Sequence, residues 1–94
     1  MKKTFSFLEK NKKPERVADS IRNEIKRYIS RERRKELPEG ATTWHFDCRI
    51  GVNEQQALAI KTNEINLKIE EYLKEKIENF YLEILAKPAN TKRD

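Results

Sequence analysis

The segment "TTWHFDCRI" (residues 42–50) decides the fold, because apolar and polar side chains alternate along it. The apolar positions are Trp44, Phe46, Cys48 and Ile50, and the polar ones between them are His45, Asp47 and Arg49. A period of two residues is typical of a strand with one buried face, and aromatic and β-branched side chains favour strands. We therefore expect a strand here that ends at Gly51.

Two more strands and two helices are predicted on either side of this segment. "KKTFSFL" (residues 2–8) alternates, and "NFYLEILAKP" (residues 79–88) is predicted as a last strand that Pro88 ends. A first helix is expected from Pro14 to just before "LPEG" (residues 37–40). Its apolar stripe consists of Val17, Ala18, Ile21, Ile25, Tyr28 and Ile29. A second helix is expected from an N-cap at Asn53 to about Glu75, since Gln56 stands in the position of a capping-box partner.

These elements predict one small domain of the α+β class. The order strand, helix, strand, helix, strand favours a two-layer sandwich, a three-stranded sheet with both helices on one face. The domain is expected over residues 1–88, with a flexible tail at residues 89–94. The chain has one cysteine and no run of about 20 apolar residues, so neither an internal disulfide nor a membrane span is expected and a cytoplasmic location is the default.

The only Trp, His and Cys of the chain lie within residues 44–48. Alternation places Cys48 toward the core and His45 on the opposite face, so the two are not expected to form a nucleophile–base pair. The open face would collect a weak candidate set: His45, Asp47, Arg49, Tyr81 and Glu83. Acid–base chemistry is conceivable there, but a solvated, ion-paired surface is the favoured interpretation. We identify no catalytic motif, cofactor site or metal site, and therefore predict a protein that is not an enzyme.

Basic charge is concentrated in the first part of the chain. Residues 1–40 hold 13 Lys and Arg against 7 Asp and Glu, whereas residues 41–94 hold 8 against 9. On the first helix, the side opposite the apolar stripe carries four arginines within an arc of about 60°: Arg16, Arg27, Arg31 and Arg34. Because arginine forks suit phosphate, RNA or another polyanion is the predicted partner.

A competing interpretation of the first helix is a solvated face, in which Arg27, Arg31 and Arg34 pair with Glu24 and other carboxylates of the helix. The apolar stripe stops at Ile29, so the turns after it are expected to project from the body of the protein.

An alternative function is self-association or binding of a protein partner through the outer face of the second helix. Ile60 and Leu67 lie seven residues apart, nearly opposite the apolar stripe of that helix. They could pack against a second copy or a partner, they could be scattered surface residues, or the helix could be irregular near Thr62 and Asn63.

Several segments in order along the chain resemble a family of short bacterial proteins classed as a domain of unknown function. They are "KKTF", "KPERV", "RERRKELPEG", "WHFDCRIG" and "FYLEILAKPA", which together span almost the whole sequence. The resemblance implies a bacterial, cytosolic protein of this size. It brings no activity, ligand or catalytic residue.

Overall fold

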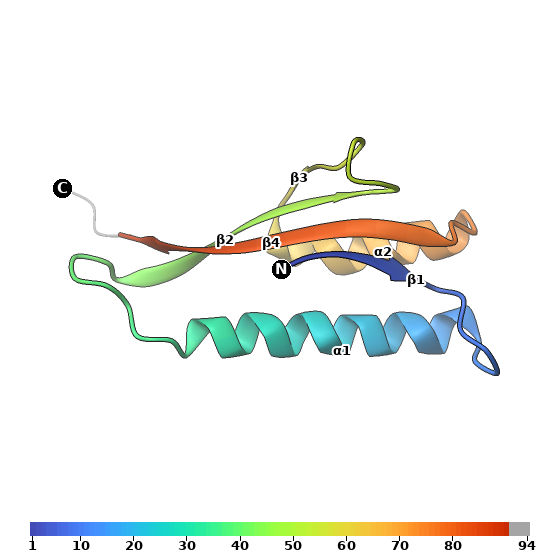
Figure 1. Cartoon of the computed structure of the whole chain (residues 1–94), viewed down its shortest axis with the longest axis horizontal. Helices are drawn as coiled ribbons and strands as arrows, with labels where there is room; N and C mark the ends of the chain where they lie inside the picture. The colour runs from blue at the N-terminus through green and yellow to red at the C-terminus, as the bar shows by residue number, and fades with distance from the viewer. Residues whose placement is uncertain (91–94) are drawn as a thin grey trace.

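The computed structural model describes residues 1–90, a β-sheet with two α-helices packed against it (Figure 1). The elements in chain order are β1 (Lys2–Ser6), α1 (Pro14–Arg33), β2 (Thr43–Gly51), β3 (Leu58–Ile60), the 3₁₀-helix η1 (Thr62–Glu64), α2 (Ile65–Lys74) and β4 (Asn79–Ala89). The α+β class is confirmed, but the sheet has four strands instead of the expected three. Neither helix is long and apolar enough to cross a membrane.

The strands lie in the order β1-β4-β2-β3, and every neighbouring pair is antiparallel. β4 pairs with β2 over the whole length of β2, from Thr43 opposite Ala89 to Gly51 opposite Tyr81. It follows that α1 connects two parallel strands, β1 and β2, which have β4 between them, and that β3 and β4 are likewise parallel with β2 between them. The last strand of the sequence thus becomes a central strand of the sheet.

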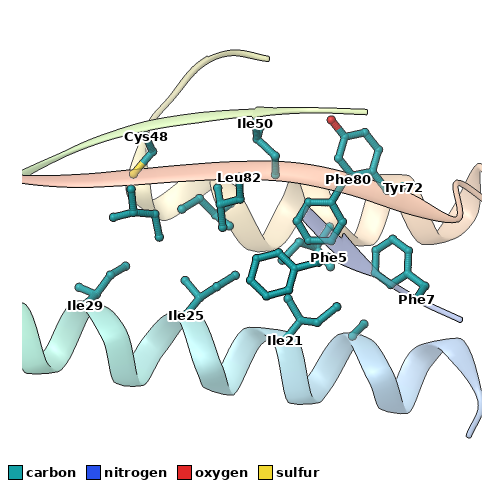
Figure 2. Close-up of a cluster of buried hydrophobic side chains, with 14 of the residues drawn as sticks. Phe5, Phe7, Ile21, Ile25, Ile29, Cys48, Ile50, Tyr72, Phe80 and Leu82 are labelled. Carbon is teal, nitrogen blue, oxygen red and sulfur yellow. The ribbon is translucent and has the colours of Figure 1, made fainter. Parts of the chain in front are cut away.

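The core lies between one face of the sheet and both helices (Figure 2). Phe80 is fully buried at its centre, with ring centroids 5.3 Å from Phe5, 5.3 Å from Phe7 and 5.7 Å from Tyr72. Burying a side chain of this kind contributes about 1.5–3 kcal/mol. The predicted α1 stripe is confirmed by its buried residues Val17, Ala18, Ile21, Ile25 and Ile29.

The predicted helix from Asn53 to Glu75 is wrong in its first part. The expected cap bond is present, since the Asn53 side chain accepts the amide of Gln56 at 2.9 Å, but it closes only a single turn. The chain then folds back past Gly51 and pairs as β3 with β2. Pairing with a distant strand therefore overrides the local helix signal. The true helix, α2, begins at Ile65 after η1.

β4 continues through Pro88 to Ala89, one residue beyond the predicted end. The amide of Ile84 donates to the carbonyl of Met1, which shows that even-numbered residues of β4 turn their main-chain groups toward β1. The pairing of β1 with β4 ends at Met1, which lies opposite Ile84. The main chain of Pro88 therefore faces a side on which the described chain has no strand. The N–H that proline lacks would have had no partner there, so no hydrogen bond of the sheet is lost. Most of the predicted tail, residues 91–94, lies outside the described residues.

Candidate polyanion interface

The outer face of α1 brings three of the four predicted arginines together. Arg27, Arg31 and Arg34 line one shallow concavity, which also contains Glu24, Lys26 and Ser30. Arg16 lies apart, beside the loop that precedes α1. Eleven residues separate it from Arg27, which is about 16 Å along a helix with a rise of 1.5 Å per residue. The candidate site is therefore the cluster of Arg27, Arg31 and Arg34, which we call the arginine cluster, with Arg16 as an outlying contact.

Within residues 1–90, none of these four arginines forms an ion pair with a carboxylate. Two carboxylates near the arginine cluster, Glu24 and Glu32, pair with lysines. The carboxylate of Glu24 forms an ion pair with Nζ of Lys3 at 2.7 Å, and that of Glu32 forms one with Nζ of Lys35 at 2.8 Å. The bond from Lys35 holds the pKa of Glu32 below its ordinary value. The pairing of the arginines with Glu24, which the competing interpretation required, is thus not formed, and no carboxylate offsets the positive charge of the cluster within residues 1–90.

The end of α1 is held against the sheet and does not project as expected. The guanidinium of Arg33 lies 5.5 Å from the ring centre of Phe46. Just beyond the helix, the carbonyl of Lys35 accepts the indole N–H of Trp44 at 3.0 Å. Both contacts come from β2, so the sheet fixes the direction of the last helical turn. The arginine cluster is consequently presented by a helix anchored at this end.

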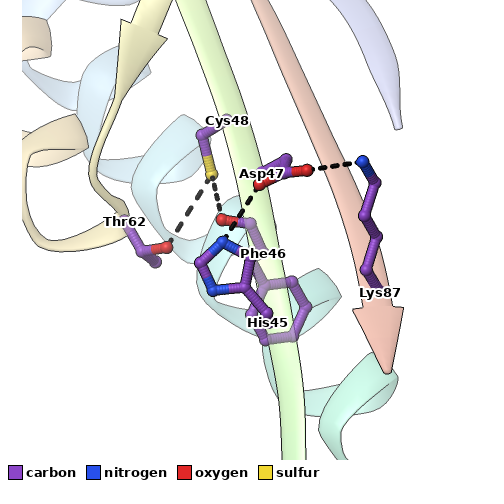
Figure 3. A network of polar contacts seen from close by, with 6 residues as sticks. All are labelled: His45, Phe46, Asp47, Cys48, Thr62 and Lys87. Carbon is purple, nitrogen blue, oxygen red and sulfur yellow. Dashed lines mark hydrogen bonds and ion pairs between the residues drawn. The ribbon is translucent and has the colours of Figure 1, made fainter. Parts of the chain in front are cut away.

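Five side chains were predicted on the open face of the sheet, and all five lie there. His45 and Asp47 contact each other at 3.0 Å between Nε2 and Oδ1 (Figure 3). The other carboxylate oxygen of Asp47 binds Nζ of Lys87 at 2.7 Å. Hydrogen bonding to Lys87 holds the pKa of Asp47 below its ordinary value. This part of the face is an ion-paired surface.

The second part of the open face is a network around Glu83. Its carboxylate accepts a hydrogen bond of 2.7 Å from the hydroxyl of Tyr81 and one of 3.5 Å from the guanidinium of Arg49. The hydrogen bond from Tyr81 lowers the pKa of Glu83, and the same bond raises the pKa of Tyr81 to about 12. Glu83 is therefore ionised and Tyr81 protonated near neutral pH, so this geometry favours a structural network over acid–base chemistry.

The prediction that Cys48 faces the core is confirmed, since its side chain is buried. Its sulfur lies 3.8 Å from the carbonyl oxygen of Phe46 and 3.8 Å from the hydroxyl of Thr62 (Figure 3). Burial raises the pKa of the thiol. His45 points to the opposite face, so the two residues do not meet.

Ile60 and Leu67 do not form the predicted patch on one helix face. Ile60 belongs to β3, lies opposite Cys48 and is half-buried against the core. Leu67 belongs to α2 and is 66% exposed. The chain passes from strand to 3₁₀-helix to α-helix between them, which corresponds to the irregularity near Thr62 that the sequence left open. No local signal marked this strand, because Leu58, Ala59 and Ile60 are all apolar and do not alternate with polar residues.

These features define a small two-layer α+β protein with an unpaired arginine cluster on its longer helix. The whole chain, residues 1–94, matches the family described as "Family of unknown function (DUF6172)", and it belongs to that family. The predicted resemblance to a domain-of-unknown-function family is therefore confirmed. Neither the search of curated proteins nor the search of solved structures finds a match for this chain.

Proposed function

We propose that this protein is a non-enzymatic binding module that holds RNA or another polyanion on the arginine cluster of α1. The observation that carries the proposal is that Arg27, Arg31 and Arg34 share one concavity while forming no ion pair in residues 1–90. We further propose that it acts in the bacterial cytoplasm, as the resemblance implies.

The chemistry of the cluster suits phosphate. A guanidinium presents a planar fork that binds two oxygens of one phosphate, and it keeps its charge at any physiological pH. Along the helix axis the three arginines are spaced by about 6 Å and about 4.5 Å, so each can reach a different group on an extended polyanion. Because Ile25 and Ile29 fix the inner face of α1 in the core, little backbone ordering is needed on binding.

The salt dependence of binding tests this proposal. We expect a fluorescently labelled RNA duplex to bind at low salt and to weaken as salt rises. For duplex nucleic acid the log–log slope is about −0.9 per phosphate contact, so three or four contacts give a slope near −3 to −4. Replacing Arg27, Arg31 and Arg34 with Gln should flatten the slope by up to about three contacts.

A charge-matched variant on the other helix is the control. Replacing Lys68, Lys74 and Lys76 with Gln removes the same positive charge from in and beside α2, and we expect it to change the slope little. A variant with Lys at the three arginine positions should keep the slope but bind more weakly, because an ammonium cannot form the bidentate fork. Failure to bind at low salt, or equal losses in both triple Gln variants, would contradict the proposal.

The alternative function, self-association or binding of a protein partner through α2, is favoured only by the exposed side chain of Leu67. We therefore propose it second. Sedimentation of the wild type at increasing concentration tests it for a homodimer, and replacing Leu67 with Glu should abolish any dimer that uses this face.

A further inference from the structure

One side of β2 is only partly covered by a strand. β4 pairs with β2 along its whole length, whereas β3 pairs only with Cys48, Arg49 and Ile50. In the described chain, residues 43–47 of β2 therefore have a strand on one side and none on the other. Figure 1 shows this end of β2 extending together with β4 beyond the rest of the sheet.

The hydrogen bonds of the sheet fix which main-chain groups face the uncovered side. Ile84 and Met1 exchange both of their hydrogen bonds, so odd-numbered residues of β4 turn their N–H and C=O groups toward β2. Leu85 lies opposite Asp47 and Lys87 opposite His45. Odd-numbered residues of β2 consequently bond to β4, and the even-numbered ones face the other way.

Trp44 and Phe46 thus present their main-chain groups along the uncovered edge. One weak contact is made to these main-chain groups: the thiol of Cys48 lies 3.8 Å from the carbonyl oxygen of Phe46. Unpaired N–H and C=O groups repeating at every second residue are what a further β-strand requires. Nothing within residues 1–90 supplies such a strand.

A concavity runs beside this edge and carries unpaired positive charge. Its lining includes Trp44, Phe46, Arg33, Ile60, Lys61 and Thr62. Arg33 and Lys61 form no ion pair within the described residues. Among the carboxylates of the lining, Asp47 pairs with Lys87 and Glu83 pairs with Arg49, whereas Glu64 accepts only the neutral amide N–H of Lys61. The four cations of the lining outnumber its three carboxylates. Charge complementarity therefore favours an acidic occupant.

We infer that residues 43–47 of β2 bind an extended acidic segment of another protein by strand addition. The added strand lies end to end with β3 and completes the same edge of the sheet. Its main chain bonds to Trp44 and Phe46, and its acidic side chains reach Arg33 and Lys61. A polypeptide is favoured over a nucleic acid because only a polypeptide repeats N–H and C=O groups with the spacing of a strand. This site is separate from the arginine cluster.

A blocked peptide of alternating Glu and Val tests the inference on the intact protein. We expect it to slow hydrogen exchange at the amides of Trp44 and Phe46, measured by NMR. The amides of His45 and Asp47 should change little, because they already donate to β4. The same peptide N-methylated at every residue keeps its charge but loses all its donors, and it should leave the exchange unchanged.

Two substitutions of Trp44 separate main-chain from side-chain recognition. Trp44→Ala and Trp44→Pro both remove the indole, but only Trp44→Pro removes the N–H that faces the free edge. We expect the Pro variant to bind the peptide about tenfold more weakly than the Ala variant, if both are folded by circular dichroism. Replacing Arg33 and Lys61 with Gln should weaken the acidic peptide severalfold and leave a neutral Thr–Val peptide unaffected.

Three results would overturn the inference. Equal effects of the normal and N-methylated peptides would show that charge alone drives binding. Concentration-dependent protection of Trp44 and Phe46 without peptide would assign the edge to a second copy. Protection by single-stranded RNA and not by the peptide would assign it to nucleic acid. The peptide comparison uses the wild type, so it decides the question even if Trp44→Pro does not fold, and it does not depend on the arginine cluster.

Discussion

The hydroxyl of Tyr81 donates a hydrogen bond of 2.7 Å to the carboxylate of Glu83 on the face of the sheet that carries no helix. Both residues are buried although they lie on the open face, each with about 6% of its surface exposed. Arg49 bridges this pair to the following loop, since its guanidinium binds Glu83 and also the carbonyl of Ala57. The network therefore ties β4, β2 and the β2–β3 loop together.

The raised pKa of Tyr81 predicts that the unfolding free energy falls at high pH. Its pKa is raised from 10.0 to about 12 by the bond to Glu83. A group whose pKa is raised on folding stabilises the native state fully below its unfolded pKa, and loses this contribution as pH rises through the folded value. The unfolding free energy of the wild type should therefore exceed that of Tyr81→Phe below pH 10, and the difference should vanish by about pH 12. Denaturant titrations of both proteins measure this; a constant difference would contradict it.

The lowered pKa of Glu83 predicts that the unfolding free energy falls at low pH. Its pKa is lowered from 4.5, chiefly by the hydrogen bond from Tyr81. Its contribution should therefore be present above about pH 4.5 and be lost as pH falls through the lower, folded pKa. Acid titration of the wild type beside Glu83→Gln tests this, because the Gln variant lacks the titrating group. Identical acid transitions in the two proteins would be the contrary outcome.

Cys48 should react slowly with a thiol reagent in the native protein and rapidly in denaturant. The side chain is buried, and burial raises the pKa of the thiol, so little thiolate forms near neutral pH. The hydroxyl of Thr62 contributes in the other direction by lowering this pKa. Thr62→Val should therefore slow native labelling further. Fast labelling of the native wild type would show that β2 presents the opposite face to the core.

Gly51 should not tolerate a side chain. A Cβ atom at this position would stand 2.7 Å from the Cα and N atoms of Ala57, and these backbone atoms cannot move without displacing β3. We expect Gly51→Ala to lower the unfolding free energy by about 1–3 kcal/mol, as overpacking does. Gly40→Asn is the comparison for backbone strain without a clash, because that site is open but its φ of 88° is one that L residues rarely adopt. Equal stabilities of the two variants would be unexpected.

Ile60 and Leu67 should respond differently to the same substitution. Ile60 is half-buried against the core, so Ile60→Glu should destabilise the fold by about 2 kcal/mol or more. Leu67 is 66% exposed, and Leu67→Glu should change the unfolding free energy by no more than about 0.5 kcal/mol. Thermal unfolding of both variants makes the comparison. A large effect of Leu67→Glu would contradict the exposed position of Leu67.

The sequence by itself determined the elements whose signal is local. The alternation through Phe46 and Cys48 predicted β2 and the faces of its side chains, and the spacing of Ile21, Ile25 and Ile29 predicted the buried side of α1. The open-face positions of His45 and Glu83 followed from the same alternation. These predictions hold because a side chain's face depends only on its own position in a regular element.

Only the tertiary structure decided the features that depend on distant partners. Asn53 and Gln56 form the bond that predicts a helix, yet pairing with β2 turns the following residues into β3. The same pairing places Ile60 in the sheet and leaves residues 43–47 of β2 uncovered. The tertiary structure also brings Lys3 to Glu24, so that these two form an ion pair and the arginine cluster is left without one. Strand pairing and ion pairing join residues far apart in the chain, and no local pattern encodes which of the available partners will meet.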